Sequence, residues 1–183
     1  MTMLEEINQL PRKLVKDLDS DIGRLGVYLV QDFSLKFLKQ IVSFGTRVLG
    51  EMSLDEWGMV PQIRHGNVYV LKEKDKPQVF GLAIFMRDWD TDDTVYLFDY
   101  AIKEDLQGYG LGYEFLKTIA ENLVEQDFNI MSLTVDVENA GAIHLYTNKL
   151  GFEIKEFKKD EYGEGHDRFY MEMDMKAFLE KNK

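Results

Sequence analysis

Three glycines fall within six residues in the segment QGYGLG, residues 107–112. The run TVYLFDYAI at 94–102 before it predicts a strand, and the run at 113–128 after it has helical periodicity. The first backbone N–H groups of a helix lack partners within the helix and carry partial positive charge, so they attract anions. Because glycine has no side chain to block an approaching group, the segment predicts a phosphate or pyrophosphate site. A helix start that packs tightly on a sheet is the alternative interpretation.

The turn matches neither of two familiar phosphate-binding motifs. It is not the G-x-x-x-x-G-K-[ST] sequence of a P-loop, and the run GYGLGY from residue 108 lacks the third-glycine spacing of the dinucleotide fingerprint. It also follows several runs that resemble antiparallel strands, whereas the dinucleotide motif belongs to a first β-α-β unit. The glycines alone therefore leave the ligand open.

Hydrophobic periodicity and turn residues outline the elements that must position this turn. Strands are expected at 23–33, 68–73, 79–85, 94–102, 129–137 and as a terminal pair around 163–166, and helices at 34–50, within 51–66, at 113–128 and at 139–151. This order predicts one mixed α+β domain over residues 21–183. Residues 1–20 place Leu10, Leu14 and Leu18 at helical spacing after Pro11, which predicts a short helical extension.

The charge of the chain bears on its partners. Its 183 residues include 33 Asp and Glu against 22 Lys and Arg, a formal net charge of -11. Phosphate backbones are repelled by such a surface, which argues against nucleic acid, whereas a cationic amine is attracted. Acidity that serves only solubility is the other explanation.

Several classes of chemistry and location are disfavoured by composition. There is no cysteine, so a cysteinyl acyl-enzyme and thiolate metal sites are impossible. His65, His144 and His166 have no ligand spacing, so no metal is expected. No apolar run approaches the roughly 20 residues that span a bilayer, and no secretory signal is visible, so no membrane association and a cytoplasmic location are expected.

The wider context of the turn resembles the central motif of the GNAT superfamily of acetyl-CoA-dependent N-acetyltransferases. That motif, [Q/R]-x-x-G-x-[G/A] after a strand, is matched by Gln107, Gly108, Tyr109, Gly110, Leu111 and Gly112. A second signature, N-x-x-A-x-x-x-Y-x-x-x-G-F, is matched in VENAGAIHLYTNKLGFE (137–153) by Asn139, Ala142, Tyr146, Gly151 and Phe152. The resemblance covers about residues 22–175. It implies a mostly antiparallel sheet of about six or seven strands, flanked by helices, with one splayed strand pair.

The resemblance implies a binding role for each part of the first motif. The pantetheine arm of acetyl-CoA would dock on the backbone of Tyr100, Ala101 and Ile102, and the pyrophosphate would bind the amides from Gly108 to Tyr113. Asn139 matches an asparagine that contacts the cofactor, although it could serve only as a helix cap. Tyr146 matches a tyrosine whose hydroxyl lies near the cofactor sulfur and protonates the leaving thiolate. Packing of an ordinary core aromatic is its alternative role.

The base that deprotonates the amine is not identified by the resemblance. Relatives carry a glutamate at the position matched here by Thr134, or at a position near Tyr96, and neither residue is a carboxylate. Asp99, beside the docking residues, is the first substitute, and Asp136 and Glu138 come next. A chain of water molecules without a dedicated base remains open.

The predicted function is transfer of an acetyl group from acetyl-CoA to a primary amine by direct attack in a ternary complex. A non-catalytic module that senses acyl-CoA, or the same fold with another acyl donor, is the alternative. The segment GEGHDRFYMEM (163–173) resembles the tail of acetyltransferases that act on peptide N-termini. The acceptor is therefore expected to be a small amine or a peptide N-terminus, a homodimer is left open, and Trp57 and Trp89 are expected to pack rather than to bind substrate.

Overall fold

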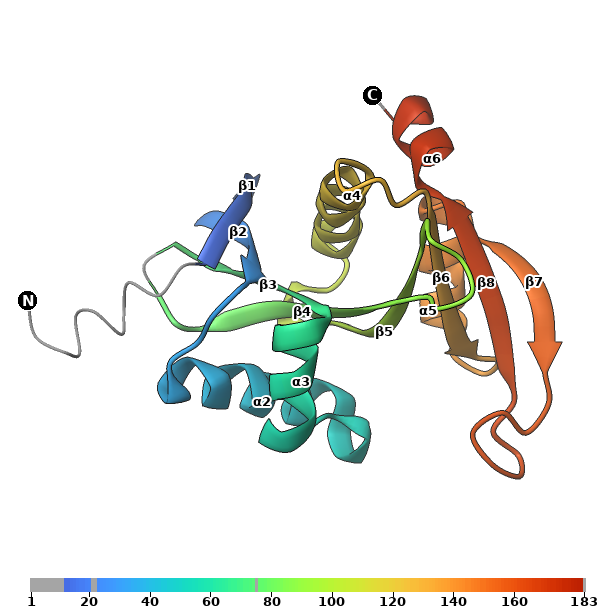
Figure 1. Ribbon diagram of the computed structural model, residues 1–183, viewed down its shortest axis with the longest axis horizontal. Helices are drawn as coiled ribbons and strands as arrows, with labels where there is room; N and C mark the ends of the chain where they lie inside the picture. The colour runs from blue at the N-terminus through green and yellow to red at the C-terminus, as the bar shows by residue number, and fades with distance from the viewer. Residues whose placement is uncertain (1–11, 21–22, 75, 183) are drawn as a thin grey trace, which may run out of the picture. The chain divides into compact units, whose positions relative to one another are not determined.

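The computed structural model describes residues 12–20, 23–74 and 76–182 (Figure 1). Its strands are β1 (Arg12–Ser20), β2 (Gly23–Val30), β3 (Asn67–Glu73), β4 (Val79–Arg87), β5 (Thr94–Ile102), β6 (Ile130–Asp136), β7 (Glu153–Lys158) and β8 (Arg168–Asp174). Its helices are α2 (Leu35–Leu49), α3 (Glu56–His65), α4 (Leu111–Val124), α5 (Ala140–His144) and α6 (Met175–Lys181), with short helical segments η1 (Gly50–Met52), η2 (Glu104–Leu106) and η3 (Leu145–Lys149).

The chain divides into two compact units. The first contains the described part of Met1–Phe85 together with Asp99–Ile119, and the second contains Met86–Phe98 and the described part of Ala120–Lys183. The strands follow the order β1-β2-β3-β4-β5-β6-β8-β7, and all described ladders are antiparallel except the parallel one between β5 and β6. This is the α+β class predicted, with eight strands where six or seven were expected.

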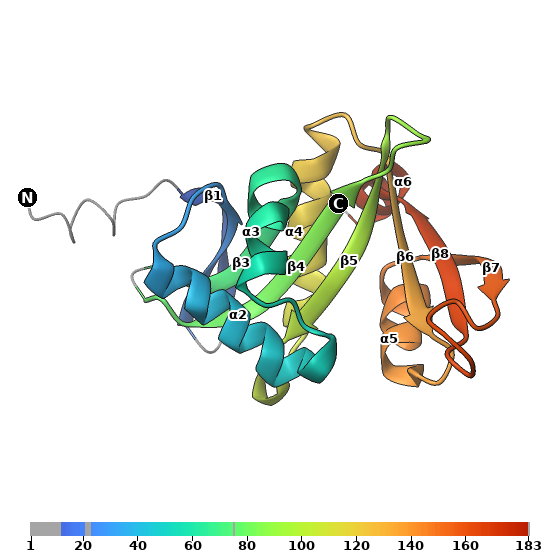
Figure 2. The same cartoon turned by 60° about the horizontal axis from the view of Figure 1, so that its bottom comes forward.

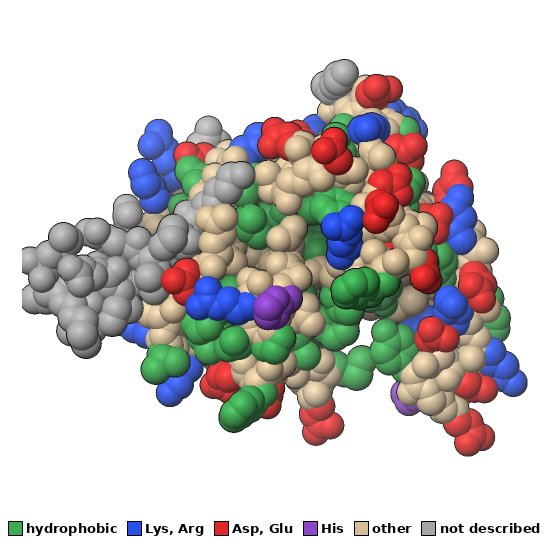
Figure 3. All heavy atoms as spheres, in the orientation of Figure 1, with side chains coloured by type: hydrophobic (Ala, Val, Ile, Leu, Met, Phe, Trp, Pro, Cys, Tyr) green, Lys and Arg blue, Asp and Glu red, His purple; other side chains and the backbone are tan. Residues whose placement is uncertain are grey.

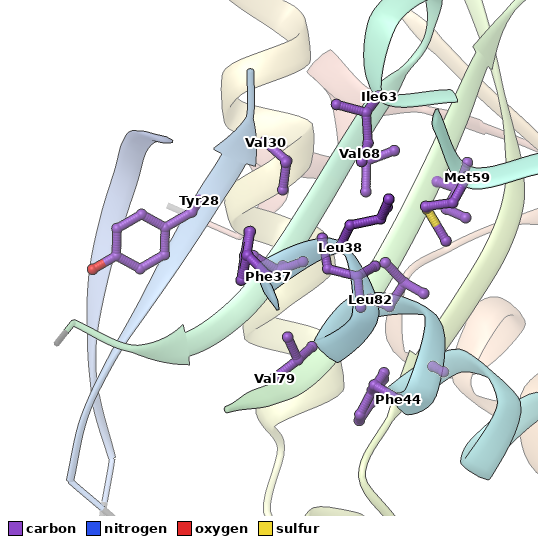
Figure 4. Close-up of a cluster of buried hydrophobic side chains, with 14 residues drawn as sticks. Tyr28, Val30, Phe37, Leu38, Phe44, Met59, Ile63, Val68, Val79 and Leu82 are labelled. Carbon is purple, nitrogen blue, oxygen red and sulfur yellow. The ribbon is translucent and has the colours of Figure 1, made fainter. Parts of the chain in front are cut away.

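Helices cover both faces of the sheet within the first unit. Val68, Val70 and Leu82 face α2 and α3 in one hydrophobic cluster (Figures 2 and 4). Neighbouring positions along a strand point to opposite faces. Accordingly, a Cβ on Gly81 would meet Phe115 of α4 at 3.2 Å on the other face. This second layer holds the start of α4, and therefore the glycine turn, against the strands.

Helix α2 begins and ends at the residues that the sequence predicts. Ser34 is its N-cap, with the hydroxyl Oγ accepting from the N–H of Phe37 at 3.2 Å. Gly50 follows its last residue with a φ of +68°, which glycine adopts without strain. The hydrophobic spacing predicts that Leu35, Leu38 and Ile41 share the apolar face of this helix. Leu38 and Ile41 are buried, whereas Leu35 is exposed, so the predicted helix is confirmed with an apolar face narrower than predicted.

In the second unit, β6 is the best buried strand. Met131, Leu133 and Val135 are buried, and β6 pairs with β8 along its whole length, from Ile130 to Asp136. Its parallel ladder with β5 has only three pairs and ends at Tyr96 and Ser132. A ladder that stops this early agrees with the splayed strand expected from the resemblance.

The prediction of a helix over residues 1–20 is wrong where the structure describes it. Residues Arg12–Ser20 form β1, which pairs antiparallel with β2, and residues 1–11 lie outside the described part. Pairing with β2 decided between a helix and a strand. A bulge between Leu14 and Lys16 sets Leu14 opposite Tyr28 and Leu18 opposite Leu25, so the two leucines lie on opposite faces, with Leu18 buried and Leu14 41% exposed. The boundary between an extension and a single domain stays a prediction.

The described residues contain neither a membrane-spanning helix nor a metal-binding cluster of side chains. No helix among them is long and apolar enough to cross a membrane. Within the same described ranges, no three His, Asp or Glu side chains are grouped so that they could hold a metal ion.

Candidate active site

The turn between β5 and α4 has a backbone that requires glycine at two positions. Gly108 and Gly110 have φ angles of +83° and +78°, a region that L-residues rarely adopt. A Cβ at either position would meet nothing within 4 Å. The requirement therefore comes from backbone conformation alone, and the space beside the turn is open to a ligand.

Gly112 is required for a different reason, which is close approach. The hydroxyl of Tyr100 donates a hydrogen bond of 2.8 Å to the carbonyl of Gly112. A Cβ on Gly112 would lie 2.8 Å from that same hydroxyl oxygen, closer than real Cβ contacts come. The third glycine of the motif thus allows the end of β5 to be fastened to the first turn of α4.

A second contact ties the turn to the strand. The side-chain amide of Gln107 donates to the carbonyl of Ile102 at 3.1 Å, so the glutamine of the motif spans the intervening η2 segment. Leu111 is buried, while Tyr109 between the glycines is 73% exposed. The Gln107 and Leu111 side chains thus anchor the two ends of the turn.

The first turn of α4 presents backbone amides beside these glycines. Glu114 N–H donates to the carbonyl of Gly110 at 3.1 Å, so the helical ladder begins there. The amides of Leu111 and Gly112 have no acceptor within the helix, as at every helix N-terminus. Open space, bare backbone and the positive end of a 14-residue helix fit a phosphate group.

Asp99 is a partly buried carboxylate in β5. Its Oδ2 is buried and has no hydrogen-bond partner among the described residues. Burial raises the pKa of Asp99 to about 6, because desolvation disfavours the charged form. A carboxylate with a pKa in this range can accept a proton near neutral pH.

Tyr146 lies in η3 of the second unit and is buried. Its ring packs against Phe152 of the same motif, with 5.4 Å between ring centroids. Burial raises the pKa of Tyr146, and the nearby hydroxyl of Tyr96 raises it further. The phenol is therefore protonated at neutral pH and can donate a hydrogen bond.

Three hydroxyl groups, from Tyr96, Thr134 and Tyr162, form a cluster beside it. Tyr96 Oη and Thr134 Oγ1 are 2.8 Å apart, and Thr134 Oγ1 and Tyr162 Oη are 3.5 Å apart. Burial raises the pKa of Tyr96 to about 12, more than its hydrogen bond with Thr134 lowers it. Tyr96 and Thr134, where the resemblance implied a carboxylate, are thus joined by a hydrogen bond between neutral groups.

The charged side chain of Arg168 packs on the ring of Tyr162, the exposed residue of this hydroxyl cluster. The Arg168 guanidinium lies 4.6 Å from the centre of the Tyr162 ring and forms an ion pair of 3.5 Å with Asp136. The other oxygen of Asp136 accepts from the N–H of Glu138 at 2.9 Å. Asp136 therefore has partners at both oxygens, which favours Asp99 over it as a base.

Asn139 acts as a helix cap. Its Oδ1 accepts from the N–H of Ala142 at 3.0 Å and starts α5. Its side-chain NH₂ group is left over for a second role, so cofactor contact stays a prediction. Glu138 beside it is exposed, in a place where nothing excludes water.

The predicted residues are divided between the two units. The first holds Asp99 and all cofactor-binding residues from Tyr100 to Tyr113, and the second holds Asn139 and Tyr146. Sequence reasoning did not find Tyr162, although an aromatic residue in the glycine-rich loop between β7 and β8 was a usable signal. Trp57 and Trp89 were expected to pack, but they are 86% and 100% exposed.

Comparison with known proteins places these features in a family. A model of the acetyltransferase (GNAT) family matches residues 40–152, from α2 to the end of the second motif. The N-alpha-acetyltransferase daf-31 of Caenorhabditis elegans is 27% identical over 114 residues, which are 61% of this chain and 63% of that protein. The chain thus spans less than two thirds of the length of this relative.

Solved structures share the fold. The ribosomal-protein-S18-alanine N-acetyltransferase of Escherichia coli has a TM-score of 0.67 at 20% identity, over 82% of this chain and 94% of that one. A GNAT family acetyltransferase from Elizabethkingia anophelis with acetyl-CoA bound has a TM-score of 0.62 at 15% identity, over 82% and 97%. At such identities the likeness establishes the architecture and not the substrate.

Proposed function

Because the chain belongs to the acetyltransferase (GNAT) family, we propose that it transfers the acetyl group of acetyl-CoA to a primary amine. The observation that carries the proposal is the glycine turn. Gly108 and Gly110 leave open backbone at the N-terminus of α4, where a pyrophosphate is the fitting anion. The neighbour with acetyl-CoA bound supports the same co-substrate.

Amine deprotonation is the first chemical requirement. A primary amine near pKa 10 is mostly protonated at neutral pH, and only its neutral form attacks a thioester. Asp99 is the proposed base, acting directly or through water, because its Oδ2 is buried without a hydrogen-bond partner among the described residues and burial raises its pKa to about 6. The chain has no cysteine for a cysteinyl acyl-enzyme, and its family resemblance supports direct attack in a ternary complex.

Collapse of the tetrahedral intermediate is the second requirement. The thiolate leaves with a negative charge, and a neutral phenol that donates to it lowers the barrier. Tyr146 supplies that phenol in the proposal, since its raised pKa keeps it protonated. A backbone N–H of β5 would polarise the thioester carbonyl.

The acceptor class proposed is the N-terminal amine of a protein or peptide. Support comes from the name of the nematode relative, an N-alpha-acetyltransferase, and from the net charge of -11, which attracts a cationic amine. Tyr162 adds a half-exposed aromatic ring with a fixed hydroxyl, a surface on which peptide backbone can pack and hydrogen-bond.

The test is thiol release from acetyl-CoA with a matched set of acceptors. The set contains a peptide with a free N-terminus and no lysine, the same peptide acetylated at its N-terminus, that blocked peptide with one lysine, and several small primary amines. Release with the first peptide only is expected. Release only with the lysine peptide would make lysine side chains the acceptor, and release only with small amines would make small amines the acceptor. Binding of acetyl-CoA without thiol release with any acceptor would favour the alternative of an acyl-CoA sensor.

A further inference from the structure

The strand β7 forms an open edge of the second unit. It is last in the strand order and pairs with β8 on one side (Figure 1). Five of its six residues, Glu153 to Phe157, are exposed, including Ile154 at 48% and Phe157 at 53%. A sheet edge offers a row of backbone donors and acceptors that another strand can use.

A bulge places the two apolar side chains of β7 on one face. Ile154 pairs with Met171 and Phe157 with Phe169, while Lys155 has no partner in the β8 register. Met171 and Phe169 are two residues apart and so share a face of the sheet. Ile154 and Phe157 therefore share that face too, although three residues separate them, and Phe157 packs against Phe169 at 6.0 Å.

The charged residues of β7 have an order that complements itself. The strand reads EIKEFK from Glu153 to Lys158. Laid antiparallel against a second copy about its centre, it pairs Glu153 with Lys158, Ile154 with Phe157, and Lys155 with Glu156. Every charged residue then meets its opposite, and each apolar residue meets an apolar one. Acidic and basic side chains indeed lie close together along the right-hand margin of Figure 3, where β7 lies in Figure 1.

We propose that β7 is a self-recognition edge, at which two copies of the chain pair antiparallel across a two-fold axis between Lys155 and Glu156. Within one copy, Lys155 bonds Glu153 at 2.6 Å and Lys158 bonds Glu156 at 3.3 Å. Each cation exchanges this partner for a carboxylate of the other copy. Charges and bulges at an edge deter indiscriminate pairing, and here the charge order selects a strand of identical sequence.

The dimer is expected to be weak. Six paired residues and two apolar side chains per copy cover less than the roughly 800 Å² per partner of a standard interface. Dissociation in the micromolar range, about 8 kcal/mol, is therefore expected. The pairing uses no residue of the candidate active site and does not depend on the proposed function.

The test is sedimentation equilibrium of the full chain up to about 100 µM, at least tenfold above the expected constant. Lys155→Glu should weaken the dimer at least tenfold, because residue 155 of each copy then places a glutamate opposite Glu156 of the other copy. Glu156→Lys should weaken it as much, because a lysine then lies opposite Lys155 at both places. The double variant Lys155→Glu/Glu156→Lys should restore the dimer, and an equimolar mixture of the two single variants should form a heterodimer.

The matched control is Lys176→Glu, an exposed charge reversal on α6 outside β7, which should leave the dimer unchanged. A parent chain that stays monomeric at every concentration overturns the proposal. So does a dimer that survives both single variants, since it must use another surface. Failure of both the double variant and the mixture to associate would overturn the pairing register.

Discussion

The glycine turn, residues 107–112, and the hydroxyl cluster of Tyr96, Thr134 and Tyr162 differ in the kind of chemical group that they present to a ligand. The turn offers backbone, because three of its six residues are glycines and the side chains of Gln107 and Leu111 are held against the protein. The hydroxyl cluster consists of side-chain oxygens from two strands and a loop. A site made of backbone tolerates almost no substitution at its glycines, whereas a site made of side chains can exchange one polar group for another.

The same difference explains which expected roles could be carried over from the family resemblance and which could not. The proposed anion site depends on Gly108 and Gly110, whose φ angles of +83° and +78° few other residues adopt. The base could not be carried over, because Thr134 and Tyr96 stand where the resemblance implied a carboxylate. Substitutions at the glycines of the turn should therefore change cofactor affinity, whereas substitutions of the side chains proposed for the chemical step should change the rate.

The largest effect is expected from Asp99→Asn. The parent rate should rise with pH through about 6 and then flatten, because the carboxylate must be ionised to accept a proton. The variant should lose this limb, and its rate above pH 7 should fall by about 10²-fold or more. A pH–rate profile of kcat/KM measures both, with Asp90→Asn in an exposed loop as the control.

Stability separates a base from a merely structural Asp99. Its pKa is raised from 3.8 to about 6, so the neutral carboxyl favours the fold below pH 4 and this contribution is lost as pH rises through 6. Asp99→Asn should therefore raise the free energy of unfolding at pH 8, by up to about 2 kcal/mol, and change it little at pH 4. If the variant is more stable at pH 8 but has the pH–rate profile of the parent, Asp99 is a buried carboxyl group with no role as a base.

Tyr146→Phe should reduce kcat by about 10²-fold and leave the affinity for acetyl-CoA nearly unchanged. The hydroxyl is proposed to act only as charge develops on sulfur, so its loss belongs to the transition state. Calorimetric affinity and steady-state kinetics give the two quantities. Tyr69→Phe, at a buried position of β3 outside the candidate site, is the control, and equal rates for both variants would assign Tyr146 to packing.

Gly110→Val should weaken acetyl-CoA binding by about 30-fold, or 2 kcal/mol, without unfolding the chain. A β-branched residue resists the positive φ, and its side chain occupies the open space beside the turn. Gly50→Val tests the same strain elsewhere, since Gly50 also has a positive φ and open surroundings. Equal loss of affinity in both variants would mean that strain alone is responsible.

The smallest effect is expected from Gly112→Ala, about 1 kcal/mol of stability. The new Cβ would meet the Tyr100 hydroxyl at 2.8 Å and displace its hydrogen bond. Tyr100→Phe removes that oxygen and leaves the nearest ring carbon at 3.9 Å, so the alanine should cost less in this background. Denaturant unfolding of the four chains gives the coupling energy, and additive effects would contradict the contact.

Local rules of the sequence determined much of this protein. The Ser34 cap, the glycine turn between β5 and α4, and the hairpin of β3 and β4 follow from short-range chemistry, and the structure has all three. Two motifs in order identified the family. Such features are predictable because capping, positive φ and alternation depend on a few neighbouring residues.

Tertiary structure decided the rest. Residues 12–20 became a strand because β2 was available to pair with, and Trp57 and Trp89 are exposed because nothing among the described residues covers them. The loop that carries Tyr162 brought its hydroxyl to Thr134, 28 residues away in sequence. Burial gave Asp99 its raised pKa, which no neighbour in the sequence dictates. Pairing, burial and long-range contact depend on how the whole chain packs, so the local sequence leaves them open.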